Sequence, residues 1–140
     1  MTNQPDFVLE TEIRTTPERL WTALTDGELT REYYIANARL QGDIASGNAY
    51  KYLRPDGEVM LSGTILEASP YSRLDMTFQP HWGKVSAASR NLYEIEQKGD
   101  ACLLTISHFD IQPGQSGVKD GWKAIAKKLK TMLEKERVAA

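Results

Sequence analysis

A long amphipathic helix is the clearest prediction from the pattern of apolar and polar residues. Between Ser116 and Arg137 the apolar residues recur at steps of four, three and one, the spacing of one helix face. Such a helix is about 33 Å long and needs a broad partner surface to bury that face. The residues on the face are Val118, Trp122, Ile125, Ala126, Leu129, Met132 and Leu133.

The start of the chain predicts a strand followed by two short helices. Residues 7–13 alternate apolar and polar side chains, which is typical of a half-buried strand. Thr16 as N-cap would place Pro17 at the favoured first helical position, whereas Thr15 as N-cap would put Glu18 in capping-box register. After a Thr-Asp-Gly-Glu turn, a second short helix is predicted to end near Tyr33 and Tyr34.

From Ala38 onward, glycine and proline separate short alternating segments, which predicts about six antiparallel strands. Pro55-Asp56-Gly57 and Lys98-Gly99-Asp100 are typical hairpin turns. Gly63 lies inside a predicted strand and indicates a bulge or a sharp bend. Residues 80–85, which include His81 and Trp82, are predicted to form a loop. The clearest of these strands span residues 50–54, 58–68, 73–79, 89–97 and 102–109.

The order of the elements predicts an α+β fold with a sheet of six to seven antiparallel strands. A sheet of that size twists and curls, so the terminal helix can lie across its concave side. We expect one domain over residues 1–140, because no repeat, low-complexity tract or linker divides the chain. The helix fills such a half-barrel only in part, and an apolar pocket is expected in the remainder.

Composition adds few further limits. Hydrophobic residues at 41% and charged residues at 26% are ordinary for a soluble globular protein. No apolar run is long enough for a transmembrane helix, and residues 1–6 lack the features of a secretory signal, so we expect a cytoplasmic location. Cys102 is the only cysteine, which excludes an internal disulfide.

Positive charge gathers in the predicted terminal helix. Residues 116–140 carry 7 lysines and arginines against 3 acidic residues, whereas residues 1–115 carry 10 against 16. Lys119, Lys123, Lys127 and Lys130 follow one another at helical spacing on the side away from the apolar face. They form either a solvated face that complements the helix dipole or a docking surface for an acidic partner protein or an anionic membrane. No nucleic acid partner is expected, since the rest of the chain is acidic and no binding motif occurs.

Motifs that would carry catalysis are missing from the sequence. There is no nucleophile elbow, no phosphate-binding glycine loop and no set of paired zinc ligands. His108 and Asp110 lie two residues apart, so they could form an acid–base pair, or His108 could simply be hydrogen-bonded beside the helix. His81 next to Trp82 has the same two interpretations. We therefore expect no catalytic residue, metal or cofactor, and a binding protein rather than an enzyme.

Aromatic residues come from every part of the predicted fold. They are either core residues or, for several of them, walls of the expected pocket, because their apolar rings and polar tips suit a mostly hydrophobic site. Trp122 is central to both interpretations. The residues are Trp21, Tyr33, Tyr34, Tyr50, Tyr52, Phe78, Trp82, Tyr93 and Trp122.

Three segments resemble a known superfamily. Residues 13–26, Ile-Arg-Thr-Thr-Pro-Glu-Arg-Leu-Trp-Thr-Ala-Leu-Thr-Asp, resemble the opening of the START-like, or SRPBCC, superfamily. More closely, they resemble the branch named for the C-terminal domain of the activator of heat-shock protein 90 ATPase. In that branch a Gly-Trp enters the last helix and a Leu-Lys-x-x-Leu-Glu segment closes it, similar to residues 121–125 and 129–134 here. Residues 105–108 are similar to its penultimate strand.

The resemblance implies a helix-grip fold, in which a curved sheet wraps around the C-terminal helix and leaves a cavity. Members of the superfamily bind lipids, sterols, polyketides and other hydrophobic molecules, and some are cyclases or hydrolases. This chain has Tyr33-Tyr34 where many members have a tryptophan, and Phe78-Gln79-Pro80 where a strand often ends in Phe-x-Trp. We expect the ligand to contact Trp21, Tyr34, Tyr52, Phe78, Trp82, His108 and Trp122.

Three functions follow as alternatives. The first is binding of a hydrophobic small molecule or lipid in the cavity, with His108 and the tyrosine hydroxyls orienting a polar group. The second is docking on a chaperone or another acidic partner through Lys119, Lys123 and Lys127. The third is a cyclase- or hydrolase-like enzyme, for which His108 is the only candidate acid–base residue. Exposed strand edges leave a homodimer open.

Overall fold

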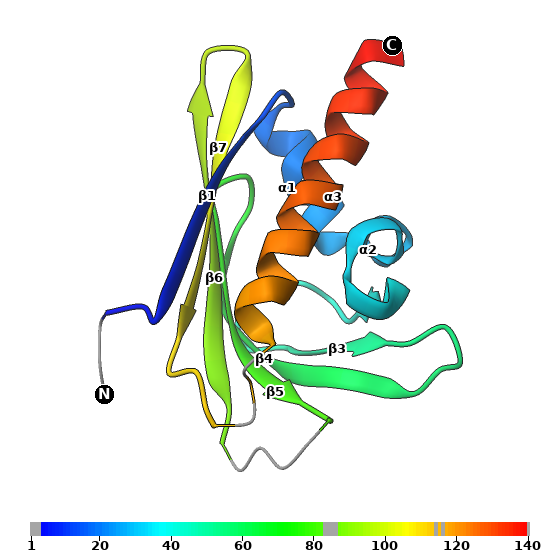
Figure 1. Cartoon of the computed structure of the whole chain (residues 1–140), viewed down its shortest axis with the longest axis vertical. Helices are drawn as coiled ribbons and strands as arrows, with labels where there is room; N and C mark the ends of the chain where they lie inside the picture. Colours follow the sequence, from blue (N-terminus) through cyan, green and yellow to red (C-terminus); the bar gives the residue numbers. More distant parts are fainter. Residues whose placement is uncertain (1–3, 83–86, 114, 116, 140) are drawn as a thin grey trace.

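A curved antiparallel sheet holds helix α3 on its concave side (Figure 1). The computed structural model describes residues 4–82, 87–113, 115 and 117–139, and within them seven strands form one sheet. The elements are β1 (Phe7–Ile13), α1 (Pro17–Thr25), α2 (Gly27–Tyr33), the 3₁₀ helix η1 (Ile35–Asn37), β2 (Arg39–Gln41), β3 (Ala49–Leu53), β4 (Val59–Ser69), β5 (Arg73–Pro80), β6 (Ser89–Lys98), β7 (Ala101–Phe109) and α3 (Val118–Ala139).

The strand order explains how the chain closes around α3. The order is β1-β7-β6-β5-β4-β3-β2, so successive strands from β2 to β7 pair as hairpin neighbours and β1 adds to the far side of β7. The predicted α+β helix-grip fold is confirmed, with α1 and α2 inserted after the first strand (Figure 1). The expected start of the long helix, Ser116, and the expected loop residues 83–85 lie outside the described residues.

Local capping decides where the two short helices begin. The Thr16 side chain accepts a hydrogen bond from the amide of Arg19, and Pro17 occupies the first turn, so Thr16 rather than Thr15 is the N-cap of α1. Asp26 then serves both helices. Its amide donates to the carbonyl of Thr22 at the end of α1, and its carboxylate accepts from the amide of Glu28 at the start of α2.

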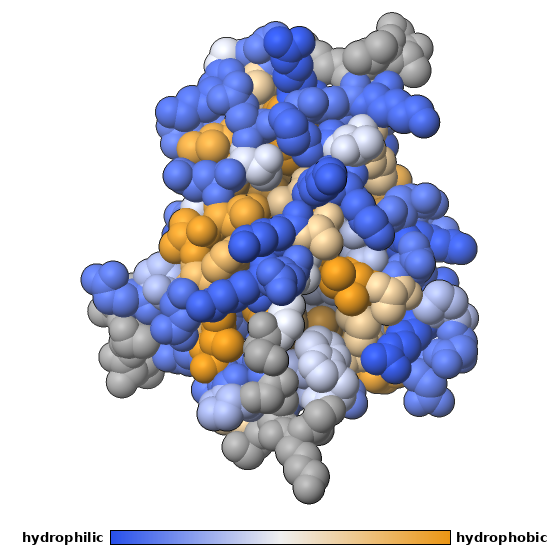
Figure 2. Space-filling view, in the orientation of Figure 1, coloured by the Kyte–Doolittle hydropathy of each residue, from blue (hydrophilic) through white to orange (hydrophobic). Residues whose placement is uncertain are grey.

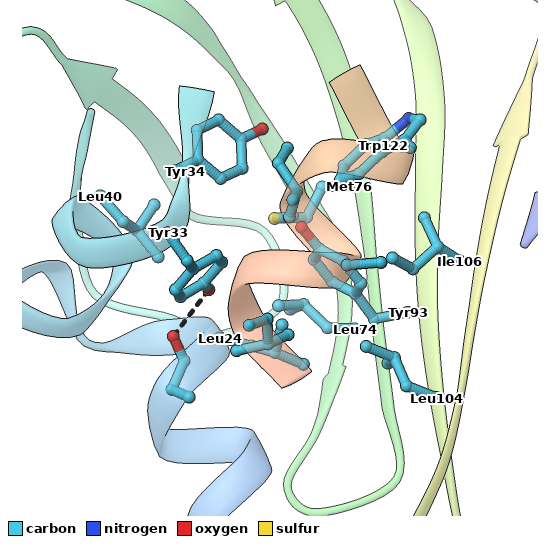
Figure 3. Packing of buried hydrophobic residues seen from close by; sticks show 14 of the residues in the cluster. Leu24, Tyr33, Tyr34, Leu40, Leu74, Met76, Tyr93, Leu104, Ile106 and Trp122 are labelled. Atoms are coloured by element: carbon cyan, nitrogen blue, oxygen red, sulfur yellow. Dashed lines mark hydrogen bonds between the residues drawn. The ribbon is translucent and has the colours of Figure 1, made fainter. Parts of the chain in front are cut away.

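The concave face of the sheet and the apolar face of α3 together form the core. Of the seven α3 residues predicted on that face, six are buried and Met132 is partly buried. From the strands, the alternation brings large apolar side chains such as Leu74, Met76, Tyr93, Leu104 and Ile106 against α3 (Figure 3). None of the described helices has a stretch long and apolar enough to cross a membrane.

Gly63 lies where three strands approach one another most closely. It pairs with Tyr50 of β3, and the Tyr50 hydroxyl crosses to donate to the carbonyl of Thr77 on β5, at 2.6 Å. A Cβ atom on Gly63 would collide with that same carbonyl and lie 2.8 Å from the Tyr50 ring. The amide of Thr64 donates to the Thr77 hydroxyl. At this point of the sheet, the side chains of Tyr50 and Thr77 therefore make hydrogen bonds with backbone groups of β4 and β5. The register shift in β4 follows between Ile65 and Glu67.

The last turns of α3 cover one end of the edge strand β1. The Lys130 ammonium donates to the carbonyl of Glu12 and also pairs with Glu134 at 2.8 Å. The Glu134 carboxylate in turn accepts from the amide of Arg14. These hydrogen bonds, chiefly the one from Lys130, hold the pKa of Glu134 below its usual value. Lys130 was expected among the solvated lysines and is instead part of the contact between helix and sheet.

Candidate functional site

A cavity of about 220 Å³ lies between the N-terminal half of α3, η1 and the strands β4 and β5. Its inner residues are buried, and the residues at its mouth are exposed or partly exposed. In Figure 2 the surface is hollowed beside α3 on the side that faces η1. The mouth is formed by Ile35, Trp82, Gly117 and Gly121, and the inner wall by Tyr34, Met60, Leu61, Phe78, Val118, Trp122 and Ile125.

Aromatic rings at steep angles to one another form a large part of the cavity wall. Phe78 and Trp82 lie 6.4 Å apart between ring centroids at 85°, and Tyr34 and Trp122 lie 6.4 Å apart at 86°. Figure 3 shows Tyr34 pointing from the end of α2 toward Trp122 on α3. Such edge-to-face pairs are favourable, because a positive ring edge meets a negative ring face. The cavity wall is therefore built largely from aromatic rings that pack edge to face.

The position of Trp122 is fixed by a buried chain of hydrogen bonds. Its indole Nε1–H donates to Nδ1 of His108 at 2.9 Å, and His108 Nε2 lies 2.6 Å from the Ser89 hydroxyl. The Ser89 hydroxyl lies 3.4 Å from the carbonyl of Phe78, which it can reach as a donor. Two cavity walls, the Trp122 ring and the backbone of Phe78, are therefore joined through His108 and Ser89.

This arrangement determines the protonation of His108. An indole only donates, so Nδ1 of His108 must be the acceptor and Nε2 must carry the proton of the neutral ring. The side chain is fully buried, and burial lowers the pKa of His108 from 6.5 to about 4, against a smaller opposing effect of Asp6. A second proton would remove the acceptor of Trp122 and bury a positive charge.

We predict that His108 makes the stability depend on pH between about 6.5 and 4. The folded state keeps the ring neutral in this range while the unfolded chain takes up a proton, so stability is complete above pH 6.5 and falls as the pH drops toward 4. The loss is about 3 kcal/mol. Urea unfolding of the wild type and of His108→Gln at several pH values measures it. Parallel curves for the two proteins would contradict the assignment.

Buried tyrosines form a second polar cluster behind the cavity wall. Tyr34 stacks on Tyr52 with ring centroids 4.1 Å apart at 11°, and the Tyr52 hydroxyl is hydrogen-bonded to Tyr34 and Tyr93. The Tyr33 hydroxyl donates to the carbonyl of Ala23 at 2.7 Å (Figure 3). Burial raises the pKa of each of these four phenols above 10.0, so all of them stay neutral.

The structure brings four of the seven predicted ligand contacts together around the cavity: Tyr34, Phe78, Trp82 and Trp122. The other three do not line it. Tyr52 lies behind Tyr34, and His108 lies behind Trp122 with both ring nitrogens in hydrogen bonds. Trp21 packs on α1 against the core as a partly buried residue. That these residues bind a ligand stays a prediction.

The sequence analysis did not predict several residues that line the cavity or lie behind its wall. Gly121 and Ile35 carry no side chain or an ordinary apolar one, so nothing in their chemistry marks them. Ser89 and Asn91 had a usable signal, since they bring polar side chains to the same face of β6 as Tyr93. Asn91 lies directly opposite His108 on the neighbouring strand, and no described residue is a partner for its side-chain nitrogen.

Three of the lysines predicted to bind a partner lie on the outer face of α3. Lys119, Lys123 and Lys127 are all exposed and follow at intervals of one helical turn. Among the described residues none of them forms an ion pair, in contrast to Lys130. The face is therefore available to an external anion or an acidic surface.

A curved antiparallel sheet that wraps around a C-terminal helix, with two short helices after the first strand, defines a helix-grip protein. A family model described as Activator of Hsp90 ATPase homolog 1-like protein matches residues 14–134. The chain belongs to this family. No curated protein matches it.

Solved structures with the same fold come from several organisms. MLL2253 from Mesorhizobium loti is 24% identical, with a TM-score of 0.78 over 92% of this chain and 96% of that one. The Aha1 dimer from Colwellia psychrerythraea is 14% identical, with a TM-score of 0.74 over 91% and 95%. PFC0360w, an HSP90 activator from Plasmodium falciparum, is 17% identical, with a TM-score of 0.74 over 93% and 96%. At these identities the likeness establishes the fold.

Proposed function

We propose that this protein binds a small uncharged apolar molecule in the cavity between η1, the strands β4 and β5, and the N-terminal half of α3. The observation that carries the proposal is Gly121. A glycine inside a helix costs up to about 1 kcal/mol relative to alanine, and at position 121 the missing side chain leaves the cavity open.

Neither the backbone nor the packing requires glycine at position 121. Its φ is not positive, and a Cβ atom there would meet only Cγ1 of Ile35, at an ordinary contact distance of 3.8 Å. A larger side chain at position 121 would instead enter the cavity, which Gly121 lines together with Trp122 and Ile35. Open space inside an aromatic-walled cavity, kept at a cost in helix stability, supports uptake of a ligand.

Two substitutions of Gly121 test this proposal. We expect Gly121→Ala to raise the free energy of unfolding by about 0.5–1 kcal/mol, because it improves the helix without a clash. We expect Gly121→Leu to remain folded and to lose ligand uptake, because the longer side chain enters the cavity. Urea unfolding measures the first effect, and native mass spectrometry of protein purified without detergent measures the second.

Lys128→Leu is the matched control, since it adds the same side chain at an exposed position of the same helix. If Gly121→Leu retained co-purified or added ligand as well as Lys128→Leu does, the cavity would not be the binding site.

A second candidate function is docking on a chaperone of the heat-shock protein 90 class through the lysines of α3. It is supported by the exposure of Lys119, Lys123 and Lys127 without ion pairs among the described residues, and by the fold shared with the Plasmodium falciparum HSP90 activator. Because the lysines are exposed, such an association would be weakened by salt.

We expect the triple variant Lys119→Glu, Lys123→Glu and Lys127→Glu to lose binding to a purified chaperone of this class at low salt. The control reverses three exposed cations away from α3, Lys51→Glu, Arg54→Glu and Lys98→Glu, and so changes the net charge equally. Surface-immobilised chaperone titrated with each variant gives the affinities. Equal loss in both triple variants would show a general charge effect, and no loss in either would remove this candidate.

A further inference from the structure

The size of the cavity limits the ligand to a narrow range. An apolar cavity of about 150 Å³ takes up one benzene molecule, and pockets for drug-sized ligands span roughly 300–1,000 Å³. The cavity here has a volume of about 220 Å³ and lies between these values. It fits one substituted aromatic ring or two fused rings. A sterol, with four fused rings and a side chain, or a long acyl chain would leave much of its apolar surface outside the mouth of the cavity.

The cavity cannot enlarge simply by rotating its inner wall. The Trp122 ring is held by its hydrogen bond to His108 and lies perpendicular to Tyr93, at 5.8 Å between ring centroids. Moving it would leave the buried Nε1–H and the His108 Nδ1 acceptor without partners, which costs more than the hydrogen bond itself contributes. The inner end of the cavity is therefore closed by a fixed residue, Trp122.

The described lining offers no compensation for a charge. Among the residues that the structure describes, none that lines the cavity has a carboxylate, ammonium or guanidinium group. Of the two polar tips in the inner wall, the Trp122 Nε1–H is used by His108, and the Tyr34 hydroxyl is hydrogen-bonded to Tyr52. A carboxylate placed here would lose its hydration without gaining a partner. A fatty acid in its ionised form is excluded for this reason, and its length disfavours it as well.

The aromatic lining of the cavity favours a flat aromatic guest. Phe78, Trp82 and Trp122 all line it, and their rings are inclined to one another, at 85° between Phe78 and Trp82 and at 50° between Phe78 and Trp122. A planar aromatic guest can place its edge against the face of a wall ring, or its face against the edge of one. Such contacts add to the binding free energy that burial of apolar area provides. A saturated ring of similar size lacks this contribution.

Resting on the function proposed above, we propose that the ligand is a neutral aromatic molecule of one ring or two fused rings. Indole and 1-naphthol are the probes for this class, decahydro-1-naphthol is their saturated counterpart, and palmitate and cholesterol represent the larger lipids. Isothermal titration of the full chain with each probe gives the affinities, and Gly121→Leu and Lys128→Leu are titrated in parallel.

We expect saturable binding of indole and 1-naphthol, about fivefold weaker binding of the saturated analogue, and no binding of palmitate or cholesterol. In Gly121→Leu the affinity for 1-naphthol should fall at least about tenfold, with Lys128→Leu unchanged. Equal or tighter binding of decahydro-1-naphthol, or binding of palmitate or cholesterol, would overturn the aromatic class and leave cavity binding in place. Failure of all five probes to bind would overturn the class and the proposed function together.

Discussion

Replacing Trp122 with alanine should lower the free energy of unfolding by about 3–5 kcal/mol. The side chain is only 2% exposed and makes edge or tilted contacts with Tyr34, Phe78, Tyr93 and His108. Its loss would merge the volume of the indole with the existing cavity and leave His108 Nδ1 without its donor. Urea unfolding followed by far-ultraviolet circular dichroism gives the change without relying on tryptophan fluorescence.

Trp82→Ala is the natural comparison, because Trp82 lines the same cavity from its partly exposed mouth. It should cost less than about 1 kcal/mol in stability, since little buried surface is lost, and should weaken ligand binding. A Trp122→Ala protein that is nearly as stable as the wild type would show that the indole is not a structural wall and does not close the inner end of the cavity as a fixed residue.

Gly63→Ala should be among the most damaging alanine substitutions at the described glycines, costing at least about 3 kcal/mol or preventing folding. The added Cβ would collide with the backbone carbonyl of Thr77, which cannot rotate away as a side chain can. That carbonyl also accepts the hydroxyl of Tyr50, so any shift breaks a buried hydrogen bond. Thermal and urea unfolding of the purified variant, or its absence from the soluble fraction, reports the effect.

Gly121→Ala provides the control for this prediction, because the same chemical change there is expected to stabilise the protein. The contrast between the two glycines separates a close approach of backbones from open space beside a cavity. Similar small effects at both positions would mean that β4 and β5 can move apart at little cost.

Much of the fold was predictable because its signals are local. The spacing of Trp122, Leu129 and Leu133 indicated the helix and its buried face, and Thr15-Thr16-Pro17 indicated the start of α1 to within one residue, with either threonine as the N-cap. The strand of residues 7–13 followed from alternation alone. In each case the information lies within a few residues of the element it defines, and the structure confirms it.

What could not be predicted depends on contacts between distant segments. In the sequence, Lys130 continues the same helical spacing of lysines as Lys127, so both are expected to be exposed. Lys130 donates to the carbonyl of Glu12 only because β1 lies beside α3 in the fold. His108 was predicted to orient a ligand, but Trp122 lies between it and the cavity. Which strand residues reach the cavity depends on how closely α3 packs against the sheet, and no local sequence pattern determines that distance.

The site was predictable in its aromatic members and not in its open space. Tyr34, Phe78, Trp82 and Trp122 are large enough to be noticed as candidate walls in a sequence. A cavity is defined equally by what is missing, and Gly121 shows this most clearly. From the sequence, a glycine in a helix shows only a low helix propensity. Its role in the cavity becomes visible only in the structure, where Gly121 lies beside Ile35 and open volume.

The clasp that Lys130 and Glu134 form over the end of β1 has a consequence for self-association. An unprotected outermost strand invites another chain to continue the sheet, and amyloid-like growth begins in this way. Here α3 occupies the Glu12 carbonyl and the Arg14 amide at one end of β1, so another chain could pair with these two groups only by displacing the helix. The same helix that encloses the interior thereby shortens the part of β1 that is open to pairing.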